Sequence, residues 1–483
     1  MDFAVRNTDM SKTIKADHSQ ILLLPPSVEE WVPINHPARF IREFVNGLDM
    51  KALEFKVNKS IDTGRPGYSP ELMLSVWLYG YFQRVYSSRK LEFACKNEMA
   101  LIWLTGMNYP DHNSLWRFWK EYKPQIKKIF KETVLVADKM DMVGMVLQAI
   151  DGTKIQTVSS RRSMWSKANL SKKLEIIDAQ IVELEKEIDL QEGSSTSSLN
   201  LPEKLHDAKN LRASIKEAKT YLEKEGLTNF HPMESEARMM KNQRVVEPCY
   251  NAQIAVDSKH QIITAETVVN KENDTAMLIP MLEKAKENLG KVAAENLADS
   301  GYNTEKSIQE AADSNFEVLV NDPKRRAIKE DEFHSAHFAF HPDGDKVICP
   351  KGTELKFERE KKGKPGQGKI KLFRCKNKEC PFLALCTRDR RGRAVEISLQ
   401  RLAVQNQNQK RENKEGRELL KKRGVIVEPV FAFIKINRGF KRFTFKTLEK
   451  AGIQWSFHCA IHNLKKIFQN WNPLMKTEIP QVA

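Results

Sequence analysis

The chain has 483 residues, of which 41% are hydrophobic and 29% charged, and this composition excludes a disordered chain or a fibrous repeat. The N-terminus carries no basic region followed by an apolar core, as a secretory signal would, and the longest apolar run (72–82) is far too short for a membrane span. The odd count of seven cysteines argues against a disulfide framework. We therefore expect a cytoplasmic protein. The net charge of +16 is unevenly placed, because residues 351–450 hold 29 Lys and Arg against 11 Asp and Glu. Such a block is typical of contact with nucleic acid, although a surface tuned for solubility is the alternative.

Residues 28–140 are predicted to be helical. In "YSPELMLSVWLYGYF", Ser69 is a candidate N-cap and Pro70 a candidate first helical residue. Two further helical stretches flank "NYPDHN". Helices joined by a short turn are compatible with a helix-turn-helix reader of DNA and equally with a helical packing unit.

The sequence pattern changes from helical to β at Met142, where the apolar run "MVGMVLQAI" leads to Asp151 and Gly152. Asp-Gly between two such runs predicts a hairpin turn. An interruption follows, with apolar residues stepping by four and three on two segments around "GSSTSS", which predicts an antiparallel coiled coil. Its seam consists of Leu170, Leu174, Ile177, Ile181, Leu184 and Ile188, then Ala208, Leu211, Ile215, Ala218 and Leu222.

After the insert, the pattern predicts two strands around a turn at 257–259. A helix, a short strand ending on Asp299, another helix and the strand "FEVLVND" follow. This order predicts a mixed sheet with helices on its faces. A carboxylate just beyond a strand can face a ligand site, because open α/β sheets bind ligands at that edge. An ordinary turn aspartate is the other interpretation of Asp299.

The segment after residue 330 is polar and lysine-rich and contains Cys349, Cys375, Cys380 and Cys386. Four thiolates can close a structural zinc site, but the spacing is looser than in zinc ribbons, and reduced cysteines in a loop are the alternative. His334, His337 and His341 are nearby candidates that are more typical of a surface. Cys95, Cys249 and Cys459 are predicted core residues. At the C-terminal side, Pro429 suits a first helical position and would place Glu428 at a helix start.

Taken in order, "IDGTKIQ", "YNAQIAVDSKH", "LADSGYN" and "VEPVFAFIK" resemble the DDE transposases of bacterial insertion sequences. "HPARFIREFVNGLDM" and "PDHNSLWRF" resemble the N-terminal domain of the same group, and "GFKRFTFKTLEKAGIQWSFHCAIHNLKKI" resembles its closing helices. The resemblance covers most of residues 20–470.

The resemblance implies an RNase H-like fold in which three carboxylates hold two Mg²⁺ or Mn²⁺ ions. These are Asp151 on a central strand, Asp299 on its neighbour and Glu428 on a packed helix. It also implies that Lys435 contacts DNA near the cut. The chain departs from related families at Lys421 and Gly424, where they have a tyrosine and an arginine, and Arg423 is a neighbouring substitute. Two such ions activate the attacking oxygen and stabilise the leaving one, so no covalent protein nucleophile is needed.

The predicted fold class is therefore α/β, an RNase H-like mixed sheet with a helical N-terminal domain, a coiled-coil insert and a cysteine-rich insert. We assign the catalytic core to 141–162, 241–329 and 409–472, and the helical, DNA-binding domain to 28–140. The coiled-coil insert spans 163–240, the basic cysteine-rich insert 330–408, and the tails 1–27 and 473–483. The expected partners are the terminal repeats and target DNA, with a homodimer in the DNA complex and no membrane. A catalytically inactive DNA-binding relative and a nuclease of the same fold are the alternative functions.

Overall fold

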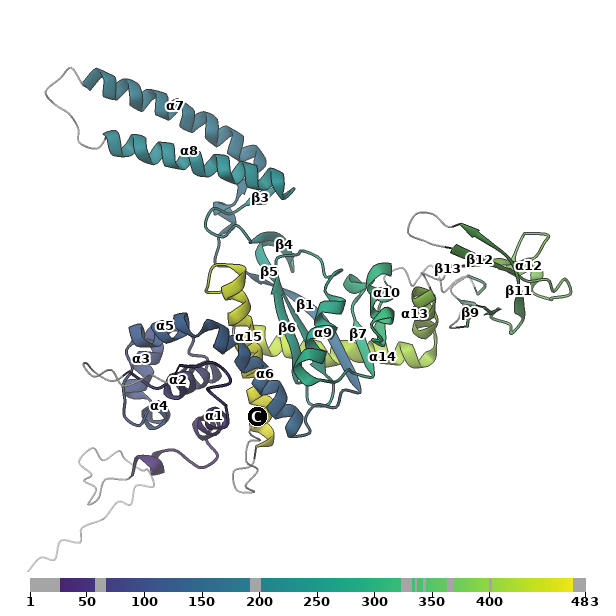
Figure 1. Cartoon of the computed structure of the whole chain (residues 1–483), viewed down its shortest axis with the longest axis horizontal. Coiled ribbons are helices and arrows are strands. Elements are labelled where there is room, and N and C mark those ends of the chain that lie inside the picture. Colours follow the sequence, from purple (N-terminus) through teal and green to yellow (C-terminus); the bar gives the residue numbers. More distant parts are fainter. Residues whose placement is uncertain are drawn as a thin grey trace, which may run out of the picture.

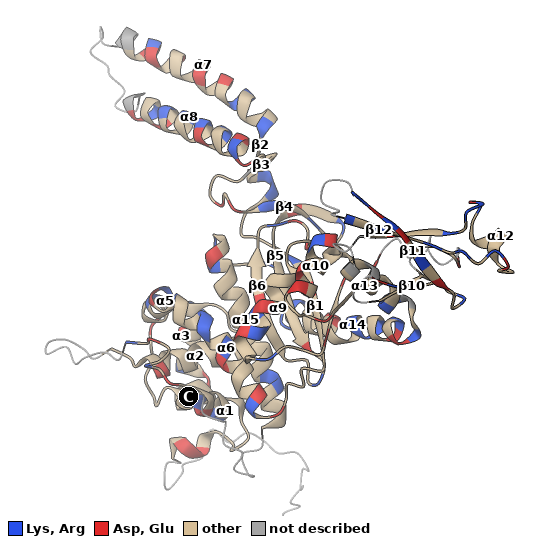
Figure 2. Cartoon of the chain, turned by 45° about the vertical axis from the view of Figure 1, so that its right-hand side comes forward, with Lys and Arg blue, Asp and Glu red and all other residues tan. Residues whose placement is uncertain are grey.

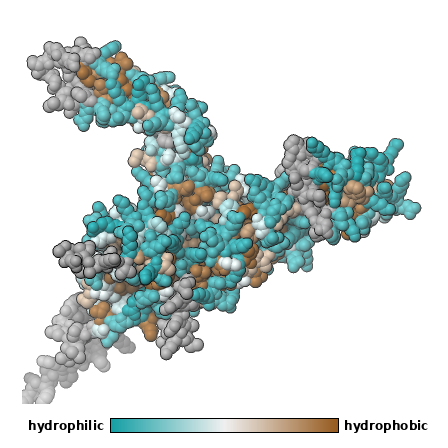
Figure 3. Space-filling model, in the orientation of Figure 1, coloured by the Kyte–Doolittle hydropathy of each residue, from teal (hydrophilic) through white to brown (hydrophobic). Residues whose placement is uncertain are grey.

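The computed structural model describes residues 27–56, 67–191, 201–322, 332–334, 337–341, 345–362, 369–398 and 402–471. The tail 473–483, nearly all of the tail 1–27 and the "GSSTSS" break lie outside these residues. A central body of sheet and helices carries two projecting units, a pair of long helices and a small β unit (Figures 1 and 3). No helix among the described residues is long and apolar enough to cross a bilayer.

The N-terminal part is helical, as predicted. Its first long helix α2 begins at Pro70, and the Ser69 hydroxyl accepts a hydrogen bond from the Leu72 amide at 3.3 Å, which confirms the predicted cap. The stretch predicted as one helix after residue 87 is divided at Glu98. The elements are the 3₁₀ helix η1 (Val28–Trp31), α1 (Pro37–Asn46), α2 (Pro70–Phe82), α3 (Ser88–Asn97), α4 (Met99–Leu104), α5 (His112–Glu121) and α6 (Lys123–Lys139).

The central sheet is mixed, with the strand order β4-β5-β1-β7-β8 and β6 paired to the other part of β5. Strand β1 is antiparallel to β5 and parallel to β7, which is in turn parallel to β8. The strands are β1 (Leu147–Gln156), β4 (Arg238–Asn242), β5 (Val245–Asp257), β6 (Ile263–Val269), β7 (Glu295–Ala298) and β8 (Val318–Val320). The predicted mixed sheet and the turn after Asp257 are thus confirmed.

The hairpin predicted at Asp151 and Gly152 is wrong. Both residues lie inside β1, where Asp151 is opposite Ile254 and Gly152 opposite Gln253 of β5. An interior glycine is tolerated here because a partner side chain occupies the space of its missing Cβ. A Cβ built on Gly152 would lie 2.1 Å from the Gln253 amide nitrogen.

Helices cover both faces of the sheet. Apolar side chains alternate along β1, so that Ala149 packs toward α6, α14 (Lys414–Ala432) and α15 (Leu448–Asn470), whereas Ile150 packs toward α9 (Leu278–Leu289) and α10 (Glu305–Asp313). Asp151 and Asp299 follow the parity of Ala149 and Leu297, and they therefore belong to the face that α14 covers.

The helix predicted to begin at Pro429 begins at Lys414 instead, and Pro429 lies in its interior. Proline has no amide hydrogen for the carbonyl four residues earlier, which is that of Val425. The Gln261 side-chain amide donates to that carbonyl at 3.1 Å and replaces the missing bond. Helix α14 then passes into a π-helical turn, η6 (Phe433–Asn437).

The two long helices α7 (Lys167–Gln191) and α8 (Leu201–Lys224) pack along one another and project from the body (Figure 1). Their buried contacts form a separate small core around Ile177, Ile181 and Ile215, in agreement with the predicted seam, except that Leu211 is 45% exposed. The pair is closed at its base by the short strands β2 (Trp165–Ser166) and β3 (Asn229–Phe230).

The second projecting unit is a five-stranded antiparallel sheet with its own core. Its elements are β9 (Ala339–Phe340), β10 (Val347–Ile348), β11 (Glu354–Lys362), β12 (Lys369–Arg374), α12 (Leu383–Cys386) and β13 (Ala394–Ser398). From there α13 (Leu402–Glu412) returns the chain to the body, where it contacts α10 and β8.

Candidate active site

Two of the three predicted carboxylates are brought together by the register of the sheet. Strands β1 and β7 are parallel, with Ile150 opposite Ala298. Asp151 and Asp299 are the next residues along these neighbouring strands and, by parity, belong to the same face. The Asp299 carboxylate also caps the following 3₁₀ turn by accepting from the Ser300 amide at 2.7 Å. The interpretation of Asp299 as a site residue and its interpretation as a turn residue are therefore compatible.

Arg423 of α14 contacts both carboxylates. Its Nη1 lies 2.8 Å from Asp151 Oδ2 and its Nη2 lies 4.0 Å from Asp299 Oδ1. The Asp151 side chain is 19% exposed, and its burial raises the pKa of Asp151, while the nearby guanidinium acts in the opposite direction. One cationic group thus faces two closely spaced acids that would otherwise repel each other.

Glu428 lies on the same helix, five residues after Arg423, and is exposed. Its carboxylate folds back over Gly424, where a Cβ would lie 2.9 Å from Oε1. The departure from related families at Gly424 therefore leaves space that the Glu428 side chain occupies. Helix α14 packs against β1 and β7, which places Glu428 on the element that covers both aspartates.

Lys435 lies in η6 and reaches back to β1. Its ammonium donates to Thr153 Oγ1 at 2.9 Å and to the Lys154 carbonyl at 3.3 Å, two and three residues beyond Asp151. Burial lowers the pKa of Lys435. The structure thus places this lysine beside the strand of Asp151.

A fourth carboxylate, Asp274, was not predicted. It lies in the loop between β6 and α9 and supports the site from the opposite face of the sheet. Its Oδ1 accepts from Asn251 Nδ2 at 2.6 Å, Gln253 Nε2 at 2.7 Å and Lys154 Nζ at 3.3 Å. The fully buried Tyr302 donates its hydroxyl to Gln253, and burial raises the pKa of Tyr302 well above its usual value.

Glycines provide the space that Asp274 occupies. A Cβ on Gly152 would lie 2.9 Å from Asp274 Oδ1, and one on Gly301 would lie 3.3 Å from its Oδ2. These glycines follow Asp151 by one residue and Asp299 by two. The sequence signal that could have revealed Asp274 is therefore the pair of glycines beside the two predicted aspartates.

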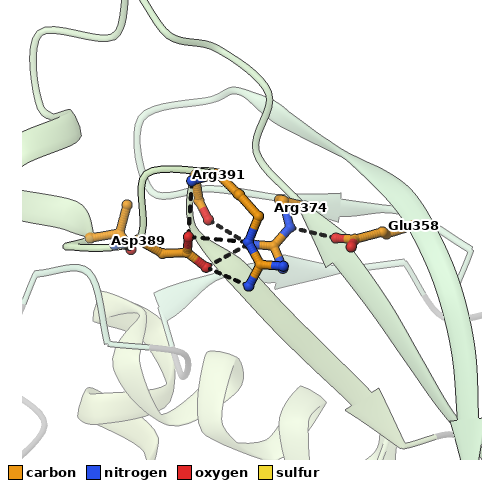
Figure 4. Close-up of polar contacts among 6 residues, drawn as sticks. Glu358, Arg374, Asp389 and Arg391 are labelled. Atoms are coloured by element: carbon orange, nitrogen blue, oxygen red, sulfur yellow. Dashed lines mark hydrogen bonds and ion pairs between the residues drawn. The ribbon is translucent and has the colours of Figure 1, made fainter.

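The cysteine-bearing unit is held by a polar network around the buried Arg374 (Figure 4). Its guanidinium donates to Glu358, to Asp389 at 2.9 Å and to the Gly392 carbonyl at 2.9 Å. Cys349, Cys375 and Cys386 pack against the core of this unit, and burial raises the pKa of the Cys386 thiol, to which the three other thiols also contribute. Cys95, Cys249 and Cys459 are fully buried, as predicted.

The basic block is not a surface of one sign. Lysine and arginine alternate with acidic residues over the β unit (Figure 2), and several pairs are within salt-bridge distance, such as Lys361 with Glu396 and Lys351 with Glu332. Such exposed pairs contribute little to stability, and they neutralise some lysines locally while the block keeps its excess of basic residues.

The donor chemistry of the site fits a divalent cation. Mg²⁺ prefers carboxylate oxygens, and Asp151 and Asp299 supply them on adjacent strands beside a cationic group. Within the described ranges, no three His, Cys, Asp or Glu side chains lie close enough together to hold a metal ion. This applies both to the three carboxylates and to the four cysteines.

Two family models match the chain. A transposase domain (DUF772) matches residues 26–121, and a transposase DDE domain matches residues 348–468. The first covers the N-terminal helices from η1 to α5, and the second covers most of the β unit together with α13, α14 and most of α15. No curated protein and no solved structure is significantly similar to the chain.

Proposed function

Because two transposase domain models match parts of the chain, we propose that it is a DDE transposase of an insertion sequence, which binds the ends of its own element and carries out metal-dependent DNA cleavage and strand transfer. The observation that carries the proposal is the adjacency of Asp151 and Asp299 on parallel strands under α14. The strand order, with β1 flanked by antiparallel β5 and parallel β7, supports an RNase H-like core.

In this proposal Asp151, Asp299 and Glu428 hold two Mg²⁺ or Mn²⁺ ions, which would activate the attacking oxygen and stabilise the leaving oxygen of the phosphodiester. The role of α14 is to bring Glu428 over the two aspartates. Arg423 balances the charge of the aspartates, and its guanidinium must turn aside as the carboxylates take up their ligand geometry. Lys435, held along β1, positions the DNA backbone next to Asp151.

The test is replacement of each carboxylate by its amide. Asp151→Asn, Asp299→Asn and Glu428→Gln should each abolish Mg²⁺- or Mn²⁺-dependent cutting of end-bearing DNA while DNA binding persists. The double variant should lose little more than either single one, because the residues act as a unit. Glu305→Gln, an exposed acid at the start of α10, is the control. A wild-type cutting rate in Asp299→Asn would contradict the assignment.

Strand transfer is measured in the same assay. Joined product with target DNA supports a transposase, whereas nicks without joined product would indicate a nuclease of the same fold. A homodimer in the DNA complex is part of the proposal, and the mass of the complex measured by light scattering tests it.

We also propose that Cys349, Cys375, Cys380 and Cys386 bind one structural zinc. Two observations support this. Cys349, Cys375 and Cys386 pack on one core, and the three other thiols contribute to the raised pKa of the Cys386 thiol. Metal analysis should find about one zinc per chain, lost in the Cys380→Ser, Cys386→Ser variant together with thermal stability. Zinc-free wild-type protein of unchanged stability would contradict it.

A further inference from the structure

A cavity of about 250 Å³ lies where α5 and α6 meet the segment that leads into α15, and none of the three predicted carboxylates lines it. Aromatic rings form one part of its lining and ammonium groups another. The aromatic residues are Trp116, Trp119 and Phe445, and the lysines are Lys120, Lys123, Lys446 and Lys450.

The rings form a short stack that is open at one end. Phe445 lies nearly parallel to both tryptophans, with 5.9 Å between centroids and angles of 22° to Trp116 and 18° to Trp119. Trp119 is only 2% exposed, whereas Trp116 is 43% exposed. The described surface has no other tryptophan among its exposed large hydrophobic side chains. A flat apolar ring is therefore held in place from behind and offered to solvent.

The four lysines give the lining of the cavity a positive charge. No carboxylate lines the cavity, and in the part of the chain that the structure describes none of the four ammonium groups forms an ion pair. This contrasts with the β unit, where many lysines have acidic partners. Four cations around an apolar ring favour a ligand that is both anionic and planar.

The cavity is connected to the carboxylate site through β1. The Phe443 amide donates to the carbonyl of Gln156, the last residue of β1, at 2.8 Å, and Arg442 pairs with the same residue. Phe445 is thus two residues from a segment attached to the strand of Asp151. The segment that carries Phe445 is therefore linked to the strand that carries Asp151.

We propose that Trp116, supported by Phe445, stacks an unpaired base of the DNA strand, while the four lysines bind the adjoining phosphates. Stacking on an aromatic ring beside a cationic groove is the general way in which proteins hold single-stranded nucleic acid without reading its sequence. An acidic peptide would satisfy the lysines but would make no use of the open indole ring. The inference rests on the proposed function and adds a site for DNA outside the catalytic carboxylates.

The test uses the full-length protein and a single-stranded oligonucleotide that contains the fluorescent base 2-aminopurine. The wild type should quench the fluorescence as the base stacks. Trp116→Ala should abolish the quenching and weaken binding by about tenfold to a hundredfold, because stacking contributes roughly 1–3 kcal/mol per base. Trp116→Phe should retain most of both, which guards against a folding defect, and Phe445→Ala should reduce the quenching.

Lysine variants separate stacking from charge. Lys120→Ala and Lys446→Ala should each lower the salt dependence of binding by about 0.7 in slope, as expected for one single-strand phosphate contact, while the bound complex still quenches. Phe93→Ala is the matched control, since this ring is 69% exposed on α3 and lies outside the cavity.

The proposal would be overturned if Trp116→Ala quenched the fluorescence and bound the oligonucleotide as the wild type does. It would also be overturned if polyglutamate displaced the oligonucleotide and neither the wild type nor any variant quenched the fluorescence. Failure of the proposed function would look different. Cutting by Asp151→Asn contradicts the carboxylate site alone, whereas duplex cutting by a wild type that never quenches 2-aminopurine contradicts the stacking site alone.

Discussion

Asp274 lies outside the proposed metal-ligand set but contacts the strand that carries Asp151. Its carboxylate joins β1 and β5 through contacts with Lys154, Asn251 and Gln253. Asp274→Ala should remove one acceptor from each of these donors and loosen the contact between β1 and β5. We expect this to lower Mn²⁺ affinity and cutting by about 10- to 100-fold. Calorimetric titration with Mn²⁺ measures the first effect independently of the second.

Asp313→Ala, which removes an exposed acid at the end of α10, is the control for Asp274→Ala. Unchanged Mn²⁺ affinity in Asp274→Ala would show that the loop carboxylate does not position the two aspartates.

Gly152 is the second residue on which the site depends. In Gly152→Ala the new methyl group would lie 2.1 Å from the Gln253 amide, so Gln253 or the strand must move. We expect a loss of about 1–3 kcal/mol in the free energy of unfolding, together with reduced cutting. Gly452→Ala is the matched control in α15, because a Cβ there meets no atom within 4 Å and should add up to about 1 kcal/mol of helix stability. Urea denaturation of both variants measures the contrast, and equal stabilities would contradict it.

At the scale of elements, α14 depends on a side chain from the turn between β5 and β6. Gln261→Ala removes the donor to the Val425 carbonyl, which lies in an exposed position where water can bond it, and should cost about 0.5–1.5 kcal/mol of stability. Pro429→Ala restores an amide at the position that can bond Val425. The loss caused by Gln261→Ala should therefore be smaller in the Pro429→Ala background.

A double-mutant cycle measured by urea denaturation gives the coupling between Gln261 and Pro429, which we expect to be about 0.5–2 kcal/mol. Strictly additive losses would mean that the amide contact does not compensate for the proline.

Individual elements show what the sequence could and could not predict. Local signals were sufficient for two parts of the chain. Helix α2 was predicted from the Ser69 cap, Pro70 and the apolar run that follows, and the α7–α8 seam from its apolar spacing. Asp151 and Gly152 were predicted as a turn, since only the partner strand reveals that Gln253 fills the glycine. Pro429 was predicted to begin a helix, because its compensating donor is 168 residues earlier in the chain, at Gln261. Asp274 was missed for the same reason, as its role depends on three residues of other strands.

At the scale of the whole molecule, the N-terminal helices share their core with α15. This core includes Phe457, Ile461 and Leu464 of α15, and α6 packs along the same helix. We therefore expect that the segment 28–140 does not fold independently. Whether it reads the ends of the element is best tested with substitutions on its surface, because its deletion would expose the apolar face of α15.

The α7–α8 pair is different, because its core is its own and its base is closed by the pairing of Trp165 with Phe230. Replacing residues 168–226 by a short glycine-serine linker should change the melting temperature by no more than a few degrees and leave the body folded. Calorimetry measures this, with deletion of 28–140 as the comparison that should aggregate. A large loss of stability in the linker variant would show that the pair supports the body.

The shared core also determines when the protein can fold during its synthesis. Helices α1 to α6 are made first, but their apolar partner α15 leaves the ribosome more than 300 residues later. At usual rates of translation this interval is roughly 15–70 s. During that time the nascent helices present an uncovered apolar face, and a chain that stops before α15 completes neither the helical core nor the sheet face that α15 covers. We therefore expect the helical core to be completed only after α15 is made, and the nascent chain to need protection from aggregation until then.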